Sequence, residues 1–256
     1  MRIVETVAEL MMHRRGRGAG STGFVPTMGA LHEGHLSLMR RARGENARLW
    51  ASIFVNPAQF DESADLQSYP RPLEEDLAVL RAAGCDLVFL PRAAEIFPDD
   101  FRYRVIETEL SRRYCGAERP GHFDGVLTVV MKLLMLVRPE RAYFGEKDFQ
   151  QLRLVEGMTK AFFLDAEIVP CPLVRETDGL AMSSRNRLLT SEERAQAPIF
   201  HQVLARSIEE ARPSAAAAAE LQREGFEVEY VADHDGRRLA AVRLGKVRLI
   251  DNVERA

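Results

Sequence analysis

Cysteine is scarce in this chain. Cys85, Cys115 and Cys171 are the only three among 256 residues, and none belongs to a C-x-x-C pair. An odd number of isolated cysteines fits neither a disulfide framework nor a zinc knuckle, so we expect buried, inert thiols. Long apolar runs are also missing, since none reaches the length of about 20 residues that crosses a bilayer. Residues 1–18 lack the apolar core and cleavage site of a signal peptide, so we expect a cytoplasmic protein without a membrane partner.

A strong charge of either sign is missing as well. The chain carries 35 Lys and Arg residues against 38 Asp and Glu residues, a net charge of −3 at pH 7. This balance gives no electrostatic basis for binding nucleic acid or an anionic membrane, although it leaves room for a local basic pocket. With 46% hydrophobic and 29% charged residues, the composition is that of an ordinary globular protein. Its length allows one large domain, or a medium domain followed by a small one.

Short apolar runs alternate with amphipathic segments over roughly the first 175 residues. The runs are continuously apolar, which is typical of parallel strands covered on both faces. They lie at residues 22–27, 48–56, 85–91, 141–146 and 166–174. Segments with helical spacing separate them, at residues 34–43, 73–84, 125–137 and 148–162. This alternation predicts an α/β fold with a Rossmann-like, doubly wound parallel sheet.

The pattern changes from about Ser183 onward. Residues 191–211 and 214–225 have helical spacing, and three later stretches alternate like strands of a small antiparallel sheet, at 226–233, 239–245 and 246–253. We therefore predict two domains, a Rossmann-like domain over residues 1–176 and a smaller C-terminal α+β domain over residues 177–256. We find no internal repeat.

The segment FVPTMGALHEGH, residues 24–35, joins the first of these predicted strands to the helix that follows. In open α/β sheets, ligands bind beyond the carboxyl ends of the strands, and a helix N-terminus at that place favours phosphate. Gly29 and Gly34 allow the backbone to come close to such a group. His32 and His35 are three residues apart, so they share one face of a helix and can donate hydrogen bonds to phosphate oxygens.

Other interpretations of this histidine pair stay open. Either side chain can be a surface residue or a helix cap rather than a ligand contact. A zinc site is disfavoured, because the remaining histidines, at positions 13, 122, 201 and 234, offer no third and fourth ligand at suitable spacing.

The decapeptide PTMGALHEGH resembles the H-x-G-H element of the HIGH-type nucleotidyltransferase superfamily, and in this full form the pantoate–β-alanine ligase family. Four later stretches resemble the same family: SYPRPLEEDL at 68–77, ERPGHFDGVLTVV at 118–130, YFGEKDFQQ at 143–151 and PLVRETDGLAMSSRN at 172–186. The resemblance runs from about Thr22 to Asn186. The final RLIDNV, residues 248–253, also resembles the family's ending, and the C-terminal part looks short for the family.

The resemblance implies an ATP site made from three of these stretches. His35 is expected to be the proton donor, and the other expected catalytic residues are His32, Lys147, Ser183 and Arg185. Lys147 can act as a point charge on phosphates, Asp148 can accept from a ribose hydroxyl, and the backbone of Val174 is expected at adenine. The expected ATP contacts are Pro26, Thr27, Met28, Gly29, Ala30, Leu31, His32, Glu33, Gly34, His35, Gly145, Glu146, Lys147, Asp148, Val174, Met182, Ser183, Ser184 and Arg185.

The acid and amine substrates, pantoate and β-alanine, are expected at a second set of side chains. These are Gln59, Gln151, Met28, Tyr69 and Arg119. A glutamine can both donate to and accept from a small acid that bears hydroxyl and carboxylate groups. Mg²⁺ is expected to travel with ATP, mainly through the phosphates, and to come near Glu75 and Asp76. The alternative for these two acids is a helical first turn in solvent, where carboxylates are favoured by the dipole.

The reaction implied by the resemblance has two steps. The carboxylate of pantoate attacks the α-phosphorus of ATP and expels pyrophosphate, and the amine of β-alanine then displaces AMP from pantoyl adenylate to give pantothenate. The resemblance also implies a homodimer formed through the first domain.

Two alternatives to this function stay open. One is a nucleotidyltransferase of the same superfamily that acts on a phosphorylated substrate, and the other is a nucleotide-binding sensor without catalysis. Gln59 and Gln151 favour a small polyhydroxy acid over a phosphorylated substrate. The presence of every catalytic-type side chain argues against the sensor.

Overall fold

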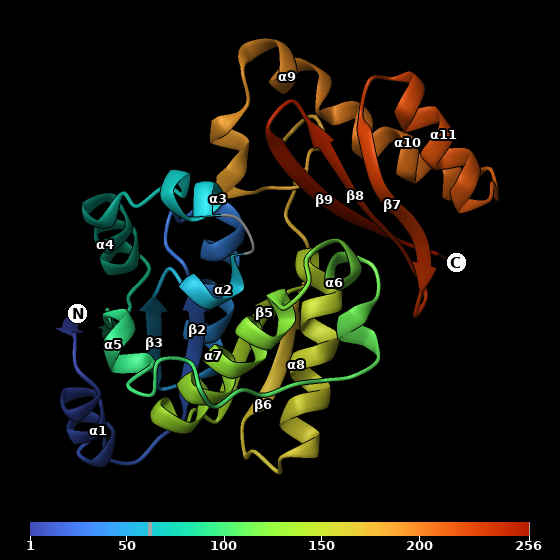
Figure 1. Ribbon diagram of the computed structural model, residues 1–256. Coiled ribbons are helices and arrows are strands. Elements are labelled where there is room, and N and C mark those ends of the chain that lie inside the picture. Colours follow the sequence, from blue (N-terminus) through green and yellow to red (C-terminus); the bar gives the residue numbers. More distant parts are fainter. Residues whose placement is uncertain (61–62, 256) are drawn as a thin grey trace. The chain divides into compact units, whose positions relative to one another are not determined.

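The computed structural model describes residues 1–60 and 63–255, which form two compact units (Figure 1). Unit 1 comprises Met1–Gly145 and Gln150–Cys171, and unit 2 comprises Glu146–Phe149 together with the described chain from Pro172 onward. Within the described residues, no helix has both the length and the apolar character needed to cross a membrane.

A parallel sheet forms the centre of unit 1. In sheet order, its six strands in the described residues are β1 (Arg2–Val4), β4 (Leu87–Phe89), β3 (Arg48–Ile53), β2 (Thr22–Thr27), β5 (Arg141–Gly145) and β6 (Glu167–Cys171), and all neighbours are parallel. The chain runs outward from β2 to β3 and β4, then returns beside β2 as β5 and continues to β6. The sheet is therefore doubly wound, as predicted. Its strand order reverses between β2 and β5, the place where such sheets bind ligands.

The central strands of this sheet are buried on both faces. Phe24 and Val25 are 1% and 0% exposed although, as neighbours on β2, they point to opposite faces. One face packs against α2 (Glu33–Glu45) and α4 (Leu73–Ala82) through a shared apolar cluster that includes Val25, Met39 and Leu80. Burial on both faces explains why these strands are continuously apolar in the sequence.

The remaining helical elements of unit 1 vary widely in length. They are α1 (Val7–Arg15), η1 (Pro57–Gln59), α3 (Ser63–Ser68), α5 (Ala93–Ile96), η2 (Leu110–Arg112), α6 (Cys115–Glu118), α7 (His122–Val137) and α8 (Phe149–Ala161), which begins at the unit boundary. Helix α7 is the most apolar of them, with 10 of its 16 residues buried, and it contacts α1 and β2. It is therefore a core element, and its apolar stretch needs no ligand to explain it.

Unit 2 contains the predicted small antiparallel sheet. The strands β7 (Glu227–His234), β8 (Arg237–Leu244) and β9 (Val247–Glu254) lie in chain order. Helix α10 (Pro198–Glu209) packs against β9, and α11 (Ser214–Arg223) packs against β7, with Phe200, Leu221 and Val242 in one core. The other elements of this unit are η3 (Glu146–Asp148), η4 (Ser184–Leu188) and α9 (Ser191–Gln196).

Candidate active site

The loop between β2 and α2 is held in shape by a carboxylate from α4. Asp76 is 2% exposed, and its oxygens accept hydrogen bonds from the backbone N–H groups of Ala30 (2.8 Å) and Leu31 (2.7 Å). Gly29 has a φ of +81°, in the left-handed region. A Cβ on Gly29 would lie 2.8 Å from Oδ2 of Asp76 and 3.1 Å from Cγ2 of Ile53. Glycine is therefore required here by the carboxylate that shapes the loop, as well as by the backbone conformation.

The carboxyl end of β2 is also tied to β3. The hydroxyl of Thr27 donates to the carbonyl oxygen of Ser52 (2.8 Å) and accepts from the N–H of Gly29 (3.2 Å). Pro26 and Thr27, both predicted ATP contacts, are thus the last two residues of a well-supported strand.

His32 and His35 cap the N-terminus of α2, and their rings lie together with centroids 4.1 Å apart. Nδ1 of His32 accepts from the backbone N–H of Gly34 (3.1 Å), and Nδ1 of His35 accepts from the N–H of His32 (3.3 Å). Because a backbone N–H can only donate, the proton of each neutral imidazole lies on Nε2. The cap and the phosphate interpretations are therefore compatible, since capping uses Nδ1 and places the proton of the neutral ring on Nε2.

Gln59 lies beside Met28, the first residue of the β2–α2 loop. The two side chains meet at 3.1 Å between Nε2 of Gln59 and Sδ of Met28. Asn56, which is 1% exposed, caps η1 through the N–H of Ala58 (3.2 Å) and donates to Oε1 of Gln59 (3.0 Å). The loops that follow the adjacent strands β2 and β3 thus bring two predicted substrate contacts together.

The backbone of Gln59 is held by Arg119, which precedes α7, and by His122, the first residue of α7. Arg119, which is 8% exposed, donates from Nη2 to the carbonyl oxygen of Gln59 (3.1 Å), and Nδ1 of His122 lies 2.7 Å from the same oxygen. Helix α7 comes so close to η1 that a Cβ on Gly125 would lie 2.1 Å from the carbonyl oxygen of Ala58. Arg119 is therefore placed at Gln59, and His122 joins the same group of residues.

The other predicted residues of unit 1 lie in different surroundings. Tyr69 is 7% exposed and packs edge-on against Phe60, with ring centroids 5.7 Å apart. Glu75 is exposed in the first turn of α4. Gln151 is half-buried on α8, whereas its buried neighbour Gln150 holds backbone groups of η2 and α6.

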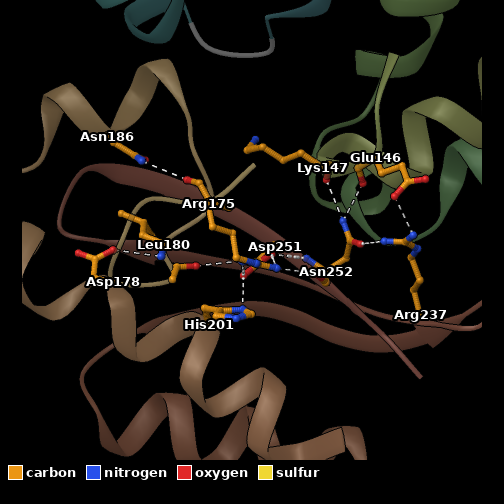
Figure 2. Close-up of polar contacts among 12 residues, drawn as sticks. Glu146, Lys147, Arg175, Asp178, Leu180, Asn186, His201, Arg237, Asp251 and Asn252 are labelled. Carbon is orange, nitrogen blue, oxygen red and sulfur yellow. Dashed lines mark hydrogen bonds and ion pairs between the residues drawn. The ribbon is translucent and has the colours of Figure 1, made fainter. Parts of the chain in front are cut away.

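In unit 2, Lys147 lies in the turn η3, directly after β5 in the chain. Its side chain is 20% exposed, and its Nζ forms a long ion pair of 3.8 Å with Oδ2 of Asp148. The backbone carbonyls of Glu146 and Lys147 accept hydrogen bonds from the side-chain amide of Asn252, at 2.9 and 3.1 Å (Figure 2). The carboxylate of Glu146 pairs with Arg237 at 2.9 Å. The backbone of Lys147 is therefore bound to Asn252 of β9, and the side chain of its neighbour Glu146 is bound to Arg237 of β8.

A short hairpin leads into the MSSR segment, residues 182–185. The N–H of Met182 donates to the carbonyl oxygen of Val174 (3.0 Å), and Arg175 forms an isolated antiparallel bridge with Ala181. Val174, predicted to contact adenine through its backbone, is thus the first residue of this hairpin.

The turn η4 and its N-cap residue, Ser183, contain the predicted phosphate-binding residues of this segment. Oγ of Ser183 accepts from the N–H of Arg185 (3.3 Å), and Ser184 is 7% exposed. Asn186 donates to Oε1 of Glu176 (2.8 Å) and so ties η4 back to the hairpin. The hydroxyls and the guanidinium of this segment are therefore on a turn with defined caps.

Neither Asp251 nor Asn252 stands out in the sequence as a site residue, yet both contact these segments. The RLIDNV stretch is the signal that could have found them, because it resembles the family's ending. Asn252 and Glu146 are separated by 106 residues, so their contact cannot be inferred from local spacing.

The three cysteines are free and buried, as predicted. Burial raises the pKa of the Cys85 thiol to about 12, so it stays protonated and poorly nucleophilic near neutral pH. Among residues 1–60 and 63–255, no group of three or more His, Cys, Asp and Glu side chains is arranged to hold a metal ion.

Comparison with known proteins identifies the family. The model of the family described as pantoate-beta-alanine ligase matches residues 2–254. The chain belongs to the pantoate–β-alanine ligase family. Among its members, the pantothenate synthetase of Bdellovibrio bacteriovorus is 52% identical to this chain over 252 residues, and the alignment covers 98% of both. That of Coxiella burnetii is 45% identical over 256 residues, covering 98% of this chain and 96% of the relative.

Solved structures of pantoate–β-alanine ligases agree with the fold. The crystal structure of pantothenate synthetase from Thermus thermophilus has a TM-score of 0.90 at 44% identity and covers 99% of each chain. The ligase of Francisella tularensis, crystallised in complex with β-γ ATP and β-alanine, has a TM-score of 0.94 at 38% identity. That comparison covers 99% of this chain and 97% of the other.

The match to the pantoate–β-alanine ligase family extends well beyond the stretches from Thr22 to Asn186 that resemble it. It includes the C-terminal sheet, since the matched residues end at 254. The C-terminal part is about as long as that of the B. bacteriovorus member, since the alignment leaves only a few residues of either chain uncovered.

Proposed function

We propose that this chain joins pantoate to β-alanine with consumption of ATP, and that pantothenate, AMP and pyrophosphate are the products. The observation that carries the proposal is membership in the pantoate–β-alanine ligase family over residues 2–254. The β2–α2 loop supports it, because two imidazole Nε2–H groups at a helix N-terminus suit a phosphate under attack.

In the first step the pantoate carboxylate attacks the α-phosphorus of ATP and pyrophosphate leaves, so that pantoyl adenylate forms. The reactants are anions that repel each other, so catalysis depends on positioning and on stabilising the charge at phosphorus. His32 and His35 donate from Nε2 to phosphate oxygens, and His35 is the proton donor. The other catalytic groups are Lys147, Ser183 and Arg185, which supply positive charge and a hydroxyl donor, and Ser184 is a further ATP contact.

In the second step the amine of β-alanine attacks the carbonyl carbon of pantoyl adenylate. The bond between that carbon and the phosphate oxygen breaks, AMP leaves with the oxygen, and the surplus proton of the amine goes to solvent. Neither step forms a covalent bond to the protein. Water must be kept from the adenylate, and we assign that task to residues 177–256 as a lid over residues 1–176, which bind nucleotide and pantoate.

We assign the substrates to two sets of residues. The proposed contacts of pantoate and β-alanine are Gln59, Gln151, Met28, Tyr69 and Arg119, and the contact of 3.1 Å between Gln59 and Met28 supports placing these two residues together. The proposed ATP contacts are residues 26–35, 145–148, 174 and 182–185. Their side chains include one Lys, one Arg, two Ser and two His, a donor-rich set that suits phosphates.

Mg²⁺ belongs to the proposal as part of the MgATP substrate. Magnesium prefers carboxylate, phosphate and water oxygens, whereas the His, Lys, Ser and Arg groups assigned to ATP are donors to the phosphates themselves. Both oxygens of Asp76 accept backbone N–H groups, which supports a metal held mainly by the phosphates, with Glu75 and Asp76 near it at most. A cytoplasmic location and a homodimer formed through the first domain remain parts of the proposal.

The products of the reaction test this proposal. In reactions that contain ATP and Mg²⁺, we expect pyrophosphate to form only when pantoate is added. We expect AMP release to require β-alanine in addition to pantoate. Chelation of Mg²⁺ with EDTA should abolish both signals. Pyrophosphate release without a pantoate requirement would indicate a nucleotidyltransferase instead, and ATP binding without turnover would indicate a nucleotide sensor.

A further inference from the structure

Asp251 and Asn252 are neighbours on β9, and together they contact both segments of unit 2 that the proposed function assigns to ATP. Both residues are almost fully buried, at 4% and 2% exposed. Neither is among the residues assigned above to catalysis or to substrate binding. Their hydrogen bonds account for this burial, and they point to a task in the reaction.

Asn252 holds the turn that carries Lys147. Both hydrogens of its amide are used, because Nδ2 donates to the carbonyl oxygens of Glu146 (2.9 Å) and Lys147 (3.1 Å) (Figure 2). The amide oxygen accepts from Nη1 of Arg237 (2.7 Å), and Nη2 of Arg237 reaches the carboxylate of Glu146 (2.9 Å). A turn of three residues is thus fixed through its backbone and through one side chain.

Asp251 holds the hairpin that leads into the MSSR segment. Its oxygens accept a bidentate pair from Arg175, at 2.8 and 2.9 Å, and Nδ1 of His201 lies 3.1 Å from Oδ2 (Figure 2). Arg175 also donates to the carbonyl oxygens of Gly179 (3.0 Å) and Asn252 (3.1 Å). The guanidinium therefore spans the hairpin between Val174 and Met182 and connects it to β9.

The pair is itself a single rigid element. The N–H of Asn252 donates to Oδ1 of its own neighbour Asp251 (2.7 Å), and both residues are in register with β8. Because charge-assisted, buried hydrogen bonds have little freedom, the position of the Lys147 turn and that of the MSSR hairpin are set by the same two residues.

We propose that Asp251 and Asn252 are positioning residues that fix the Lys147 turn and the MSSR hairpin relative to each other within unit 2. The inference rests on the proposed function, because it assumes that both segments act on the phosphates of ATP. Adenylyl transfer depends on the placement of charged groups, and substitution of outer residues that orient such groups typically changes activity by about 10- to 100-fold. Asp251 and Asn252 act through Lys147 and the MSSR residues without touching the substrate.

The hydrogen bonds of residue 252 require a side chain that donates twice and accepts once. Only an amide can donate to two carbonyls while it accepts from Arg237. Asn252→Asp keeps the shape but places a carboxylate against two carbonyl oxygens, and Asn252→Ala leaves both carbonyls without this donor. Asp251→Asn removes the charge that holds Arg175, which provides an independent variant on the hairpin side.

The matched control is Asp233→Asn. Asp233 binds Arg238 through two contacts, at 2.8 and 3.1 Å, and Arg238 is 2% exposed in the same sheet. The change therefore breaks a comparably buried ion pair of unit 2, but the ion-pair partners of Asp233, which are Arg238 and Arg255, lie outside residues 146–148 and 174–186. A loss of activity caused by general weakening of the sheet would appear in this control as well.

The test is the rate of pantoate-dependent pyrophosphate release as a function of ATP concentration, with thermal unfolding measured for each variant. We expect Asn252→Ala and Asn252→Asp to lower kcat/KM for ATP by about 10- to 100-fold, and Asp251→Asn to do likewise, while the control stays within about threefold. In a Lys147→Ala background the Asn252 changes should cost much less than in the unchanged protein, because residues that act as a unit are not additive.

The outcomes separate the two claims. Pyrophosphate release by the unchanged protein, with Asn252 and Asp251 variants no slower than the control, would overturn this inference and leave the proposed function intact. Full additivity of Asn252→Ala with Lys147→Ala would also overturn it, because it would mean that Asn252 does not act through Lys147. If Asn252→Ala does not fold, the isosteric Asn252→Asp and Asp251→Asn variants decide. Absence of pyrophosphate release from the unchanged protein would overturn the proposed function, and this inference with it.

Discussion

The two nitrogens of each imidazole at the start of α2 have different tasks. Nδ1 of His35 accepts the backbone N–H of His32, which satisfies one of the free donors at the helix N-terminus. Its Nε2 carries the proton that the proposed mechanism uses. A substitution of His35 therefore removes a helix cap and the proposed phosphate donor together, and a simple alanine variant cannot separate them.

Two amide variants separate these tasks for His35. Asn places its side-chain oxygen near the position of Nδ1, and Gln places its side-chain nitrogen near that of Nε2. We expect His35→Ala to slow adenylate formation by about 10²- to 10⁴-fold with a much smaller change in ATP affinity. His35→Asn should recover stability but not rate, and His35→Gln should recover part of the rate. Pre-steady-state pyrophosphate release and ATP titration measure the two effects.

His13→Ala is the control for this series, because His13 lies in α1, outside the proposed site. Equal losses of ATP affinity and of rate in His35→Ala would contradict a role in the transition state and leave His35 as a binding residue.

At the scale of elements, the connection between α4 and the β2–α2 loop decides the shape of the site. Asp76→Asn keeps the size of the side chain but turns one of two acceptors into a donor, which faces the N–H of Ala30 or Leu31. Leaving one buried N–H without an acceptor should lower the free energy of unfolding by about 1–3 kcal/mol. Urea denaturation measures this change.

Glu75→Gln is the matched control on the same helix, since Glu75 is exposed. We expect it to change the free energy of unfolding by no more than about 0.5 kcal/mol. A stability of Asp76→Asn equal to that of this control would contradict the role of Asp76 in holding the loop.

Elements with a strong local signal are predictable from this sequence. The run TGFVPT coincides with β2, and the apolar helix at 125–137 is most of α7, because continuous burial leaves a continuous apolar pattern. Strand β1 leaves a weaker signal, because it has three residues, two of them exposed, and lies at the edge of the sheet beside β4. Helix α1 has one buried residue, Leu10, and so leaves no clear apolar face to detect.

The residues of the candidate site are predictable where chemistry and strand ends coincide. The histidine pair, Gln59, Lys147 and the MSSR segment all follow predicted strands or resemble known motifs. The residues that hold the site in place are not predictable in this way. Asp76 and its hydrogen-bond partner Leu31 are 45 residues apart in the sequence, and Asn252 and Lys147 are 105 apart. Such contacts are made by the tertiary fold, and an isolated Asp or Asn gives no local sign of them.

At the scale of the whole molecule, unit 2 is built from two separate segments of the chain. Residues 146–149 belong to unit 2, although the strand before them and all of α8 after its first residue, Phe149, belong to unit 1. The hydrogen bonds of Asn252 and Arg237 explain this assignment, since they attach Glu146 and Lys147 to β8 and β9. A predicted catalytic lysine is thereby carried by the same unit as the MSSR segment.

The central claim is that the carboxylate of pantoate attacks the α-phosphorus of ATP, and the oxygen atoms of pantoate test it most directly. With both carboxylate oxygens of pantoate labelled with ¹⁸O, complete turnover with β-alanine should deliver AMP that carries one ¹⁸O, and pantothenate that keeps the other in its amide carbonyl. Mass spectrometry of the two products measures this transfer. AMP without label, or label in inorganic phosphate together with ADP, would contradict an acyl adenylate.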